Sequence, residues 1–328
     1  MGKWLKLLLP ILFFACSPER DNPYDPKSDF YTNRTQISGT CKNRIMIPVS
    51  GAKITLLPLA KSPLSLQTFT NDSGSYEIPD CPAESVLVIA EKDGFVTESS
   101  QVLLKVYKPE TLNFILEALP KFLTTEVTSY YCLLSYPPYD STVLVINSEI
   151  TDDEGQGDIT TVFATIDGLP DTLPLFFQSA NFYTNSFLET NLSENLDNIV
   201  GRDIILQVID RFGNKVTMAP CQLIRVIRDN TLETVTPAGG EVVSPYPILR
   251  WRSANYLFNH SFFCEIYYVP TPLPPVLCYR YENIPAGDSS FLVTDSLIDG
   301  FHYWQIGVRD SYGNWAKSAP GVFFVQSR

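Results

Sequence analysis

The C-terminal half of the chain carries the same short pattern twice, at a spacing of one hundred residues. The first copy reads Val208-Ile-Asp-Arg-Phe-Gly-Asn214 and the second reads Val308-Arg-Asp-Ser-Tyr-Gly-Asn314, and an Ala-Pro pair follows each copy after four residues. The Asp can hydrogen-bond the turn backbone and Gly-Asn tolerates positive φ, so each copy predicts a strand that ends in a tight hairpin. A period near one hundred residues predicts two similar domains in tandem.

The sequence from Arg34 onward predicts an all-β protein. Short apolar stretches rich in Val, Ile, Phe and Tyr alternate with Gly, Pro, Asn and Asp, and no amphipathic helical run exceeds two or three turns. We expect one short helix, within residues 193–200. The 328 residues, 45% of them hydrophobic, have room for two or three domains of about 100 residues with real cores. The predicted architecture is three tandem β-sandwich domains, at residues 34–118, 119–229 and 230–328.

The first fifteen residues, 1–15, predict an export signal. Lys3 and Lys6 precede a short apolar run that would span only about 14 Å as a helix, too little for the roughly 30 Å hydrocarbon core of a membrane. The stretch Phe13-Phe-Ala-Cys16 resembles a lipobox, whose Cys receives a diacylglyceryl group and becomes the new N-terminus. The alternative is a secreted soluble protein with an unmodified Cys16. Residues 16–33, polar and rich in Pro, predict an extended tether after the lipidated Cys.

The lipobox implies a protein that is anchored to a membrane outside the cytoplasm. Two or three acyl chains on Cys16 would hold it there stably, and we expect the bacterial cell envelope, at the outer membrane or the cell surface. The chain carries a net charge of −12, which becomes −14 when Lys3 and Lys6 leave with the signal. Such a charge makes nucleic acid and anionic lipid headgroups poor partners.

The last domain resembles a fibronectin type III module over its full length. The resemblance rests on Pro247-Ile-Leu-Arg-Trp251, which contains the family's core tryptophan, and on a second apolar strand. In that strand Trp304, Ile306 and Val308 share one face with His302 and should point into the core. The middle domain has the same closing hairpin without the tryptophans, and we expect an immunoglobulin-like or fibronectin-like sandwich.

The first domain resembles a carboxypeptidase regulatory-like domain, which is a transthyretin-like sandwich. The pattern covers residues 35–117 and includes Pro48-Val-Ser-Gly51-Ala and Thr70-Asn-Asp-Ser-Gly74-Ser-Tyr. We expect Gly51, Gly74 and Gly94 at turns that require positive φ or close backbone approach. The family carries no catalytic residues, so the resemblance implies none here.

The six cysteines other than Cys16 divide two by two among the predicted domains. Because an export signal implies an oxidising compartment, we expect disulfides, each confined to one domain. Cys264 and Cys278 are equidistant from residue 271, so they could face each other across a hairpin. The expected pairs are Cys41 with Cys81, Cys132 with Cys221, and Cys264 with Cys278.

The chain lacks the sequence motifs of the common enzyme classes. Its two histidines, His260 and His302, lie in no metalloprotease or nucleophile motif, and there is no phosphate-binding Gly-rich loop. We expect His302 to be a hydrogen-bonded strand residue rather than a general base. We therefore predict no enzymatic activity and no cofactor. A hydrolase with a carboxylate pair assembled by folding is the alternative, because such pairs have no sequence signature.

Residues 152–158 form the one acidic cluster that could coordinate a hard cation. Asp152, Asp153, Glu154 and Asp158 supply carboxylates, but they lack the EF-hand order and have no bidentate Glu beyond Asp158. A solvated turn between two strands explains the cluster more simply. We predict no metal site and keep these four residues as a calcium candidate.

Four aromatic residues of the last domain predict a binding surface. Tyr256 and Phe258 follow the strand of Trp251, and Tyr312 and Trp315 lie in the last hairpin. In an immunoglobulin-like fold these two connections leave the same end of the sandwich, and exposed aromatic residues on rigid loops suit sugars or peptides. The alternative is that Phe258 and Trp315 cover the end of the core.

These features together predict a non-enzymatic, membrane-anchored envelope lipoprotein that acts as a binding or scaffold module. Its expected partners are the membrane, through the lipid anchor, and an envelope protein or glycan. The alternative is a glycan-binding accessory lipoprotein of a polysaccharide degradation or uptake system. An aromatic content of 12% fits both functions, since sandwich cores also use aromatic residues.

Overall fold

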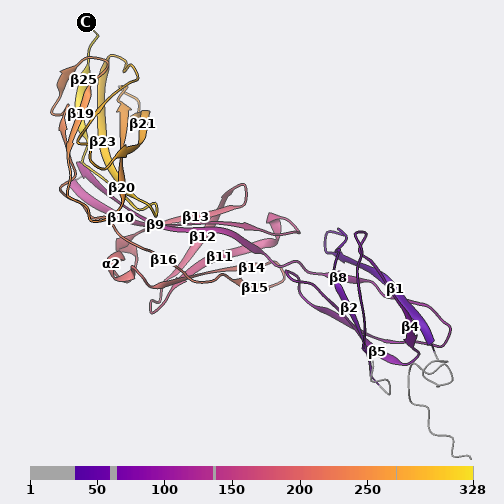
Figure 1. Ribbon diagram of the computed structural model, residues 1–328. Coiled ribbons are helices and arrows are strands. Elements are labelled where there is room, and N and C mark those ends of the chain that lie inside the picture. Colours follow the sequence, from indigo (N-terminus) through magenta and orange to yellow (C-terminus); the bar gives the residue numbers. More distant parts are fainter. Residues whose placement is uncertain (1–33, 60–64, 136–137, 271, 328) are drawn as a thin grey trace, which may run out of the picture. The chain divides into compact units, whose positions relative to one another are not determined.

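A computed structural model describes residues 34–59, 65–135, 138–270 and 272–327, and it confirms the all-β prediction (Figure 1). The single α-helix in these ranges, α2 (Leu196–Ile199), lies within the predicted stretch 193–200. The chain divides into two compact units, of which the first ends at Ala118 and the second begins at Leu119. The predicted signal and tether, with Cys16, lie outside the described residues.

The first unit is a sandwich of two sheets. One sheet has the order β4-β1-β7, with β8 also paired to β1, and the other has the order β3-β2-β5-β6. Every second residue of β5 is buried, so Val86, Val88 and Ala90 join Ile37 and Ile54 in the core. The strands are β1 (Arg34–Asn43), β2 (Lys53–Pro58), β3 (Leu66–Phe69), β4 (Ser75–Pro82), β5 (Ser85–Glu91), β6 (Glu98–Leu103), β7 (Glu110–Thr111) and β8 (Phe114–Leu116).

The turns of this unit use the three glycines that the sequence singles out. Gly51, Gly74 and Gly94 have φ values of 70°, 72° and 81°, as predicted. At Gly74 a Cβ atom would also lie 2.4 Å from the carbonyl oxygen of Cys41. Only glycine fits that position without a shift of the backbone.

The second unit begins with a sandwich whose strands follow the order β15-β14-β11-β12-β13-β10-β9, with β16 also paired to β14. The first half of β12 pairs with β11, and from Phe176 onward β12 pairs with β13. Figure 1 shows β12 running beside β13. The strands are β9 (Lys121–Ser135), β10 (Pro138–Thr151), β11 (Ile159–Ile166), β12 (Thr172–Ser179), β13 (Phe182–Leu188), β14 (Asp203–Asp210), β15 (Lys215–Thr217) and β16 (Cys221–Gln222).

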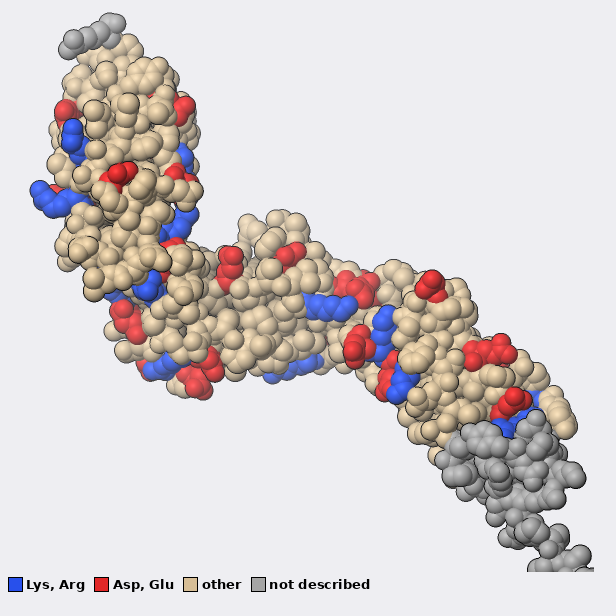
Figure 2. Space-filling view, viewed as in Figure 1, with Lys and Arg blue, Asp and Glu red and all other residues tan. Residues whose placement is uncertain are grey.

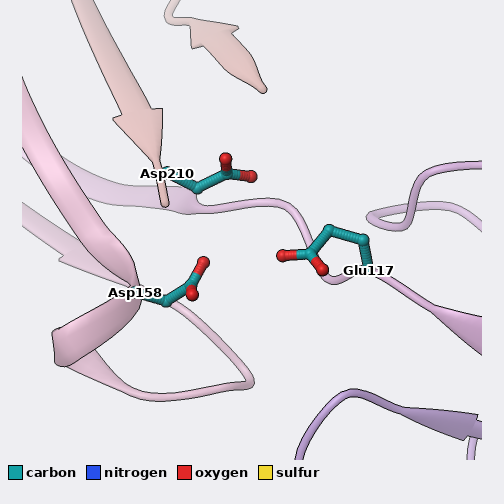
Figure 3. A group of neighbouring side chains, drawn as sticks. All are labelled: Glu117, Asp158 and Asp210. Carbon is teal, nitrogen blue, oxygen red and sulfur yellow. The ribbon is translucent and has the colours of Figure 1, made fainter. Parts of the chain in front are cut away.

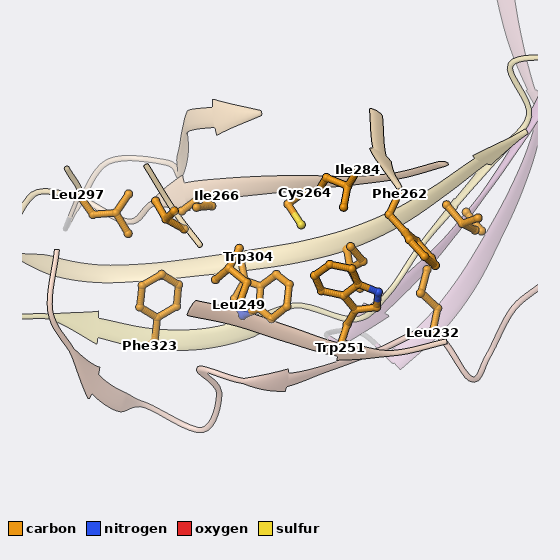
Figure 4. Packing of buried hydrophobic residues seen from close by; sticks show 14 of the residues in the cluster. Leu232, Leu249, Trp251, Phe262, Cys264, Ile266, Ile284, Leu297, Trp304 and Phe323 are labelled. Carbon is orange, nitrogen blue, oxygen red and sulfur yellow. The ribbon is translucent and has the colours of Figure 1, made fainter. Parts of the chain in front are cut away.

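The third sandwich has its core around Trp251 and Trp304 (Figure 4). Trp304, Ile306 and Val308 are fully buried, so the predicted core face is confirmed. The indole Nε1 of Trp304 donates a hydrogen bond to the carbonyl oxygen of Pro237 at 2.8 Å. The strands are β17 (Glu233–Thr236), β18 (Glu241–Val243), β19 (Ile248–Arg252), β20 (His260–Tyr268), β21 (Val276–Pro285), β22 (Ser290–Leu292), β23 (Gly300–Asp310), β24 (Trp315–Lys317) and β25 (Gly321–Val325).

His302 lies on the same face of β23 and is fully buried. Its Nδ1 atom is 3.1 Å from the carbonyl oxygen of Gly300, and its ring stacks against Phe323. Burial lowers the pKa of His302, so the ring is neutral at pH 7. The structure confirms His302 as a hydrogen-bonded strand residue.

The two copies of the repeated pattern form the same hairpin. Asp210 and Asp310 each accept hydrogen bonds from the amide two residues later, at 2.8 and 2.9 Å, and from the amide four residues later, also at 2.8 and 2.9 Å. Each also accepts a bond from the side-chain amide of Asn214 or Asn314, at 2.7 and 3.0 Å. The Gly before each Asn has a φ of 85° or 88°. The predicted hairpins are therefore confirmed.

The second hairpin also joins the third sandwich to the second. The amide of Ser129 donates a hydrogen bond to Oδ1 of Asn314 at 2.9 Å. Next to this bond β24 pairs in parallel with β9, and the ring of Trp315 stacks on Tyr130 with centroids 4.5 Å apart. The strands of the two sandwiches thus form one continuous sheet at the junction.

The predicted disulfides are wrong, because all six cysteines in the described ranges are free thiols. In the first unit Cys81 lies opposite Thr35, six residues along β1 from Cys41. That offset separates the two Cα atoms by about 20 Å, and a disulfide requires less than about 7 Å. Burial raises the pKa of both thiols to about 11, so they are protonated at neutral pH.

The other two predicted pairs fail for related reasons. Cys264 lies opposite Tyr281 in the β20–β21 pairing, three residues from Cys278. An offset of three residues is about 10 Å and places the two side chains on opposite faces of the sheet. Cys221 packs against the core of the second sandwich, whereas Cys132 lies opposite Lys317 at the junction.

Candidate functional site

The second sandwich has a groove where β11 and β12 separate. Their pairing ends at Val162 opposite Leu175, and beyond that point β11 pairs with β14 while β12 pairs with β13. A groove of about 490 Å³ lies between the separated ends. It is lined by Gln156, Gly157, Tyr183 and the stretches 159–162 and 174–177, none of which carries a charged side chain.

Two phenylalanines are exposed at this groove. Phe176 is 61% exposed and Phe177 is 53% exposed, although the two leucines before them on β12 are buried. The ring of Phe177 meets Tyr183 edge to face, with centroids 5.6 Å apart. The groove therefore has apolar, aromatic walls that are open to solvent.

A fixed polar network lies beside these rings. The hydroxyl of Tyr183 donates to Oε1 of Gln156 at 3.0 Å. The Nε2 atom of Gln156 donates to the carbonyl oxygen of Ile150 at 2.7 Å and to Oδ1 of Asn181 at 2.8 Å. Burial raises the pKa of Tyr183, so its hydroxyl keeps its proton. These bonds hold the wall of the groove in one conformation.

The acidic turn shares Gln156 and Gly157 with the groove, and the structure brings together three of its four predicted carboxylates. Ligand oxygens of Asp152, Glu154 and Asp158 all lie within 4.8 Å of one another. Asp158 ends the short helix η1 (Gln156–Asp158), just before β11. Asp153 is outside this group, and its Oδ2 atom forms an ion pair with Nζ of Lys121 at 3.3 Å.

Two carboxyl groups of the turn, those of Asp152 and Asp158, have raised pKa values. Burial, and then the nearby carboxylates of Asp158, Glu154 and Asp153, raise the pKa of Asp152 to about 6. Burial, followed by the charges of Asp210 and Glu154, also raises the pKa of Asp158. Burial and mutual repulsion thus oppose the ionisation of Asp152 and Asp158.

Asp210 ends β14 near Asp158, and both side chains are drawn in Figure 3. The two carboxylate oxygens of Asp210 accept hydrogen bonds within its own hairpin and stabilise the turn that follows β14. Glu117, also drawn in Figure 3, belongs to the first unit, in which it forms an ion pair with Arg44.

The predicted aromatic surface of the third sandwich lies at the junction with the second sandwich. Trp315 is partly buried, because it stacks on Tyr130 of β9. Tyr312 precedes it in the same hairpin and is 57% exposed.

The other two predicted residues are partly buried against the core. Phe258 packs against the core, and the guanidinium of Arg225 lies 4.2 Å from the centroid of its ring. Tyr256 also packs against the core and donates a hydrogen bond to Asp229. Burial and this bond raise the pKa of Tyr256. An exposed patch of all four residues is therefore not formed, and their part in binding stays a prediction.

Comparison with known families identifies the first sandwich. Residues 36–117 match the sequence profile of the carboxypeptidase regulatory-like domain. The first sandwich is a carboxypeptidase regulatory-like domain. The predicted resemblance over residues 35–117 is thus confirmed. A search of curated proteins found no match to this chain.

Comparison with solved structures finds similar β-domain proteins. The major pilin subunit of Bacillus cereus is 9% identical with a TM-score of 0.34, covering 90% of this chain and 98% of its own. A DUF3823 family protein from Bacteroides ovatus is 8% identical with a TM-score of 0.27, covering 58% and 98%. A streptococcal ancillary pilin is 10% identical with a TM-score of 0.26, and the match covers 60% of this chain and 62% of the pilin. The helices in the described ranges are too short to cross a membrane.

The groove of the second sandwich is not among the sites that the sequence predicts. Its signal is the run Pro174-Leu-Phe-Phe-Gln178, in which two consecutive aromatic residues break the alternation of a half-buried strand. Such a break indicates that the strand leaves the regular sheet. Which strand it joins next depends on pairing between residues far apart in the chain, which the run itself does not show.

Proposed function

We propose that this chain is a membrane-anchored binding protein of the bacterial cell envelope, which takes its ligand in the groove of the second sandwich. The observation that supports it is the exposed pair Phe176 and Phe177 beside the fixed network of Tyr183 and Gln156. Covering a Phe side chain fully contributes about 1.5–3 kcal/mol, so a ligand that covers both rings gains substantially. The fixed polar groups would give that ligand its orientation.

The groove favours a neutral glycan as the ligand. None of the residues that line it is charged, and Thr161 adds a hydroxyl group beside its aromatic wall. Figure 2 shows Lys, Arg, Asp and Glu scattered over a largely uncharged surface on the face that it draws. Aromatic faces beside polar groups suit the apolar faces and hydroxyls of sugar rings. This supports a role as the glycan-binding accessory protein of a polysaccharide degradation or uptake system.

Replacing Phe177 with Ala should weaken glycan binding at least tenfold, because it removes one wall of the groove. A tenfold loss corresponds to about 1.4 kcal/mol, within the value of covering one ring. The measurement is affinity electrophoresis of the purified protein in gels that contain neutral polysaccharides. The melting temperature should change little, since the side chain is 53% exposed.

Phe212→Ala is the matched control, because Phe212 is 50% exposed on the same sandwich and does not line the groove. It should bind like the wild type. Unchanged binding by Phe177→Ala would contradict the groove as the binding site. If no neutral polysaccharide retards the wild-type protein, the proposal that the ligand is a neutral glycan is wrong.

The anchor makes a separate prediction. Cys16→Ala should move the protein from the detergent-soluble membrane fraction to the soluble fraction, or leave its signal uncleaved, because the acyl chains can no longer attach. The measurement is fractionation of cells followed by immunoblotting. A variant that fractionates with the membrane at its processed size, like the wild type, would show that Cys16 is not the anchor.

A further inference from the structure

We propose that the acidic turn of the second sandwich, Asp152, Glu154 and Asp158, binds a calcium ion. The calcium proposal does not depend on the glycan proposal, because the ion can bind when the groove holds no glycan. From the sequence alone, a solvated turn between two strands is the simpler explanation of these carboxylates. The structure supports a specific metal site instead.

The three carboxylates lie close enough to share one ion. Their ligand oxygens lie within 4.8 Å of one another. Calcium binds oxygen at about 2.3–2.6 Å, so two oxygens on opposite sides of one ion lie at most about 5 Å apart. All three side chains can therefore reach a single ion without a large movement of the backbone.

Asp158 has a buried oxygen that lacks a hydrogen bond from the described part of the chain. Asp158 is 6% exposed, and its Oδ2 atom has no hydrogen-bond partner among the described residues. Asp158 is the buried member of the group that it forms with Asp152 and Glu154. A buried, ionised oxygen without a donor is costly, and a bound cation would remove that cost.

The local backbone occupies only one of the two carboxylate oxygens of Asp152. Its Oδ1 atom accepts the amide of Glu154 at 2.7 Å, and its carbonyl oxygen accepts the amide of Gly155 at 3.0 Å. Its Oδ2 atom is buried and has no such partner in the described part of the chain. Gly155, with a φ of 99°, lets the chain reverse and carry Asp158 back toward Asp152.

Two basic side chains near the turn have other direct partners. Lys121 forms its ion pair with Asp153, and Nη2 of Arg211 donates to the carbonyl oxygen of Gly157 at 2.9 Å. Within the described ranges, neither forms an ion pair with Asp152 or Asp158. A further positive charge beside Asp152 and Asp158 would offset the repulsion between their carboxylates.

The donor atoms select the metal. All three side chains offer carboxylate oxygen, which hard cations prefer, and the group contains no His or Cys. Magnesium demands a near-ideal octahedron at about 2.0–2.1 Å and gives up its water reluctantly, whereas calcium accepts irregular sets of six to eight oxygens. Three side chains on one short turn fit calcium better, with water completing the shell.

The test is thermal unfolding of the purified full-length protein in EGTA and in calcium chloride. Calcium at about one hundred times its Kd should raise the melting temperature of the wild type by about 5 °C or more. Asp158→Asn should abolish the rise. Asp153→Asn, the same substitution on a carboxylate outside the group, should keep it.

The measurement in EGTA separates a ligand from a structural carboxylate. Without calcium, Asp158→Asn should melt at or above the wild-type temperature, because it removes one of several repelling charges. Isothermal titration with calcium chloride should show one bound ion for the wild type and none for Asp158→Asn. No calcium-dependent shift in the wild type, an equal shift with magnesium, or a variant that melts lower in EGTA would each overturn the proposal.

Discussion

Replacing Glu265 with Gln should destabilise the second unit by about 3–5 kcal/mol, the usual range for breaking a buried ion pair. Glu265 is 3% exposed, and its oxygens contact Nζ of Lys317 at 2.6 Å, Nη1 of Arg280 at 3.2 Å and the hydroxyl of Tyr267 at 2.8 Å. Gln keeps the shape of the side chain but leaves the half-buried ammonium of Lys317 without its counter-charge. We expect a melting temperature about 10 °C lower in calorimetry.

Glu282→Gln provides the matched control, because Glu282 also forms ion pairs with Arg280 and with Arg309. The side chains of that group are all about a third exposed, so solvent screens them. The expected loss is at most about 1 kcal/mol. Equal losses for the two variants would show that burial does not strengthen the contacts of Glu265.

The difference between wild type and Glu265→Gln should also depend on pH. Burial opposes ionisation of Glu265, but the hydrogen bond and charge of Lys317, with the hydroxyl of Tyr267, hold its pKa below the ordinary value of 4.5. A carboxyl with a lowered pKa in the folded state stabilises the fold above its unfolded pKa and loses that effect as pH falls through the folded pKa. The difference should therefore be full at pH 7 and shrink below about pH 4.5. A difference that stays constant down to pH 3 would contradict this origin.

Much of the fold follows from local patterns in the sequence. The alternation around Trp304, Ile306 and Val308 predicts a core face, and the structure buries all three completely. The Asp and Asn of each repeated hairpin act within five residues of each other, so the spacing alone predicts their bonds. Features of this kind depend on neighbours along the chain.

The disulfide predictions are wrong because they depend on the register between paired strands. Cys264 and Cys278 are symmetric about residue 271, but the β20–β21 pairing ends with Tyr268 opposite Val276, which centres the hairpin on residue 272. A bulge between Ile266 and Tyr267 then shifts the pairing by one more residue. Two small displacements that the sequence does not show move Cys278 away from Cys264.

The candidate sites divide in the same way. The acidic turn is local, and three of its four predicted carboxylates meet in space. The groove exists because β12 changes its neighbour from β11 to β13, and this depends on the pairing of strands that are distant in sequence. Tyr256, Phe258 and Tyr312 are loop residues, as predicted, whereas Trp315 begins β24. That strand pairs with β9, so the surroundings of Trp315 follow from a contact between sandwiches.

Replacing Asn314 with Ala should cost clearly more than replacing Asn214 with Ala, although the two residues occupy the same place in the repeated hairpin. Each side-chain amide donates to the Asp of its own hairpin, and losing that bond costs about 1.5–3 kcal/mol at most because the acceptor is charged. Asn314 additionally accepts the amide of Ser129 from β9 at 2.9 Å. Both Asn314 and Ser129 are almost completely buried.

The additional loss arises because Asn314→Ala leaves the Ser129 amide buried without an acceptor, which costs about 1–3 kcal/mol. Denaturant unfolding should therefore show a larger fall in the free energy of unfolding for Asn314→Ala by about that amount. Hydrogen exchange supplies the sharper readout, since the Ser129 amide should lose protection in Asn314→Ala and keep it in Asn214→Ala. Equal effects of the two substitutions would mean that the bond between Ser129 and Asn314 does not stabilise the junction of the second and third sandwiches. The expected inequality follows from the fold, because one hairpin forms a turn and its repeat one hundred residues later also joins two sandwiches.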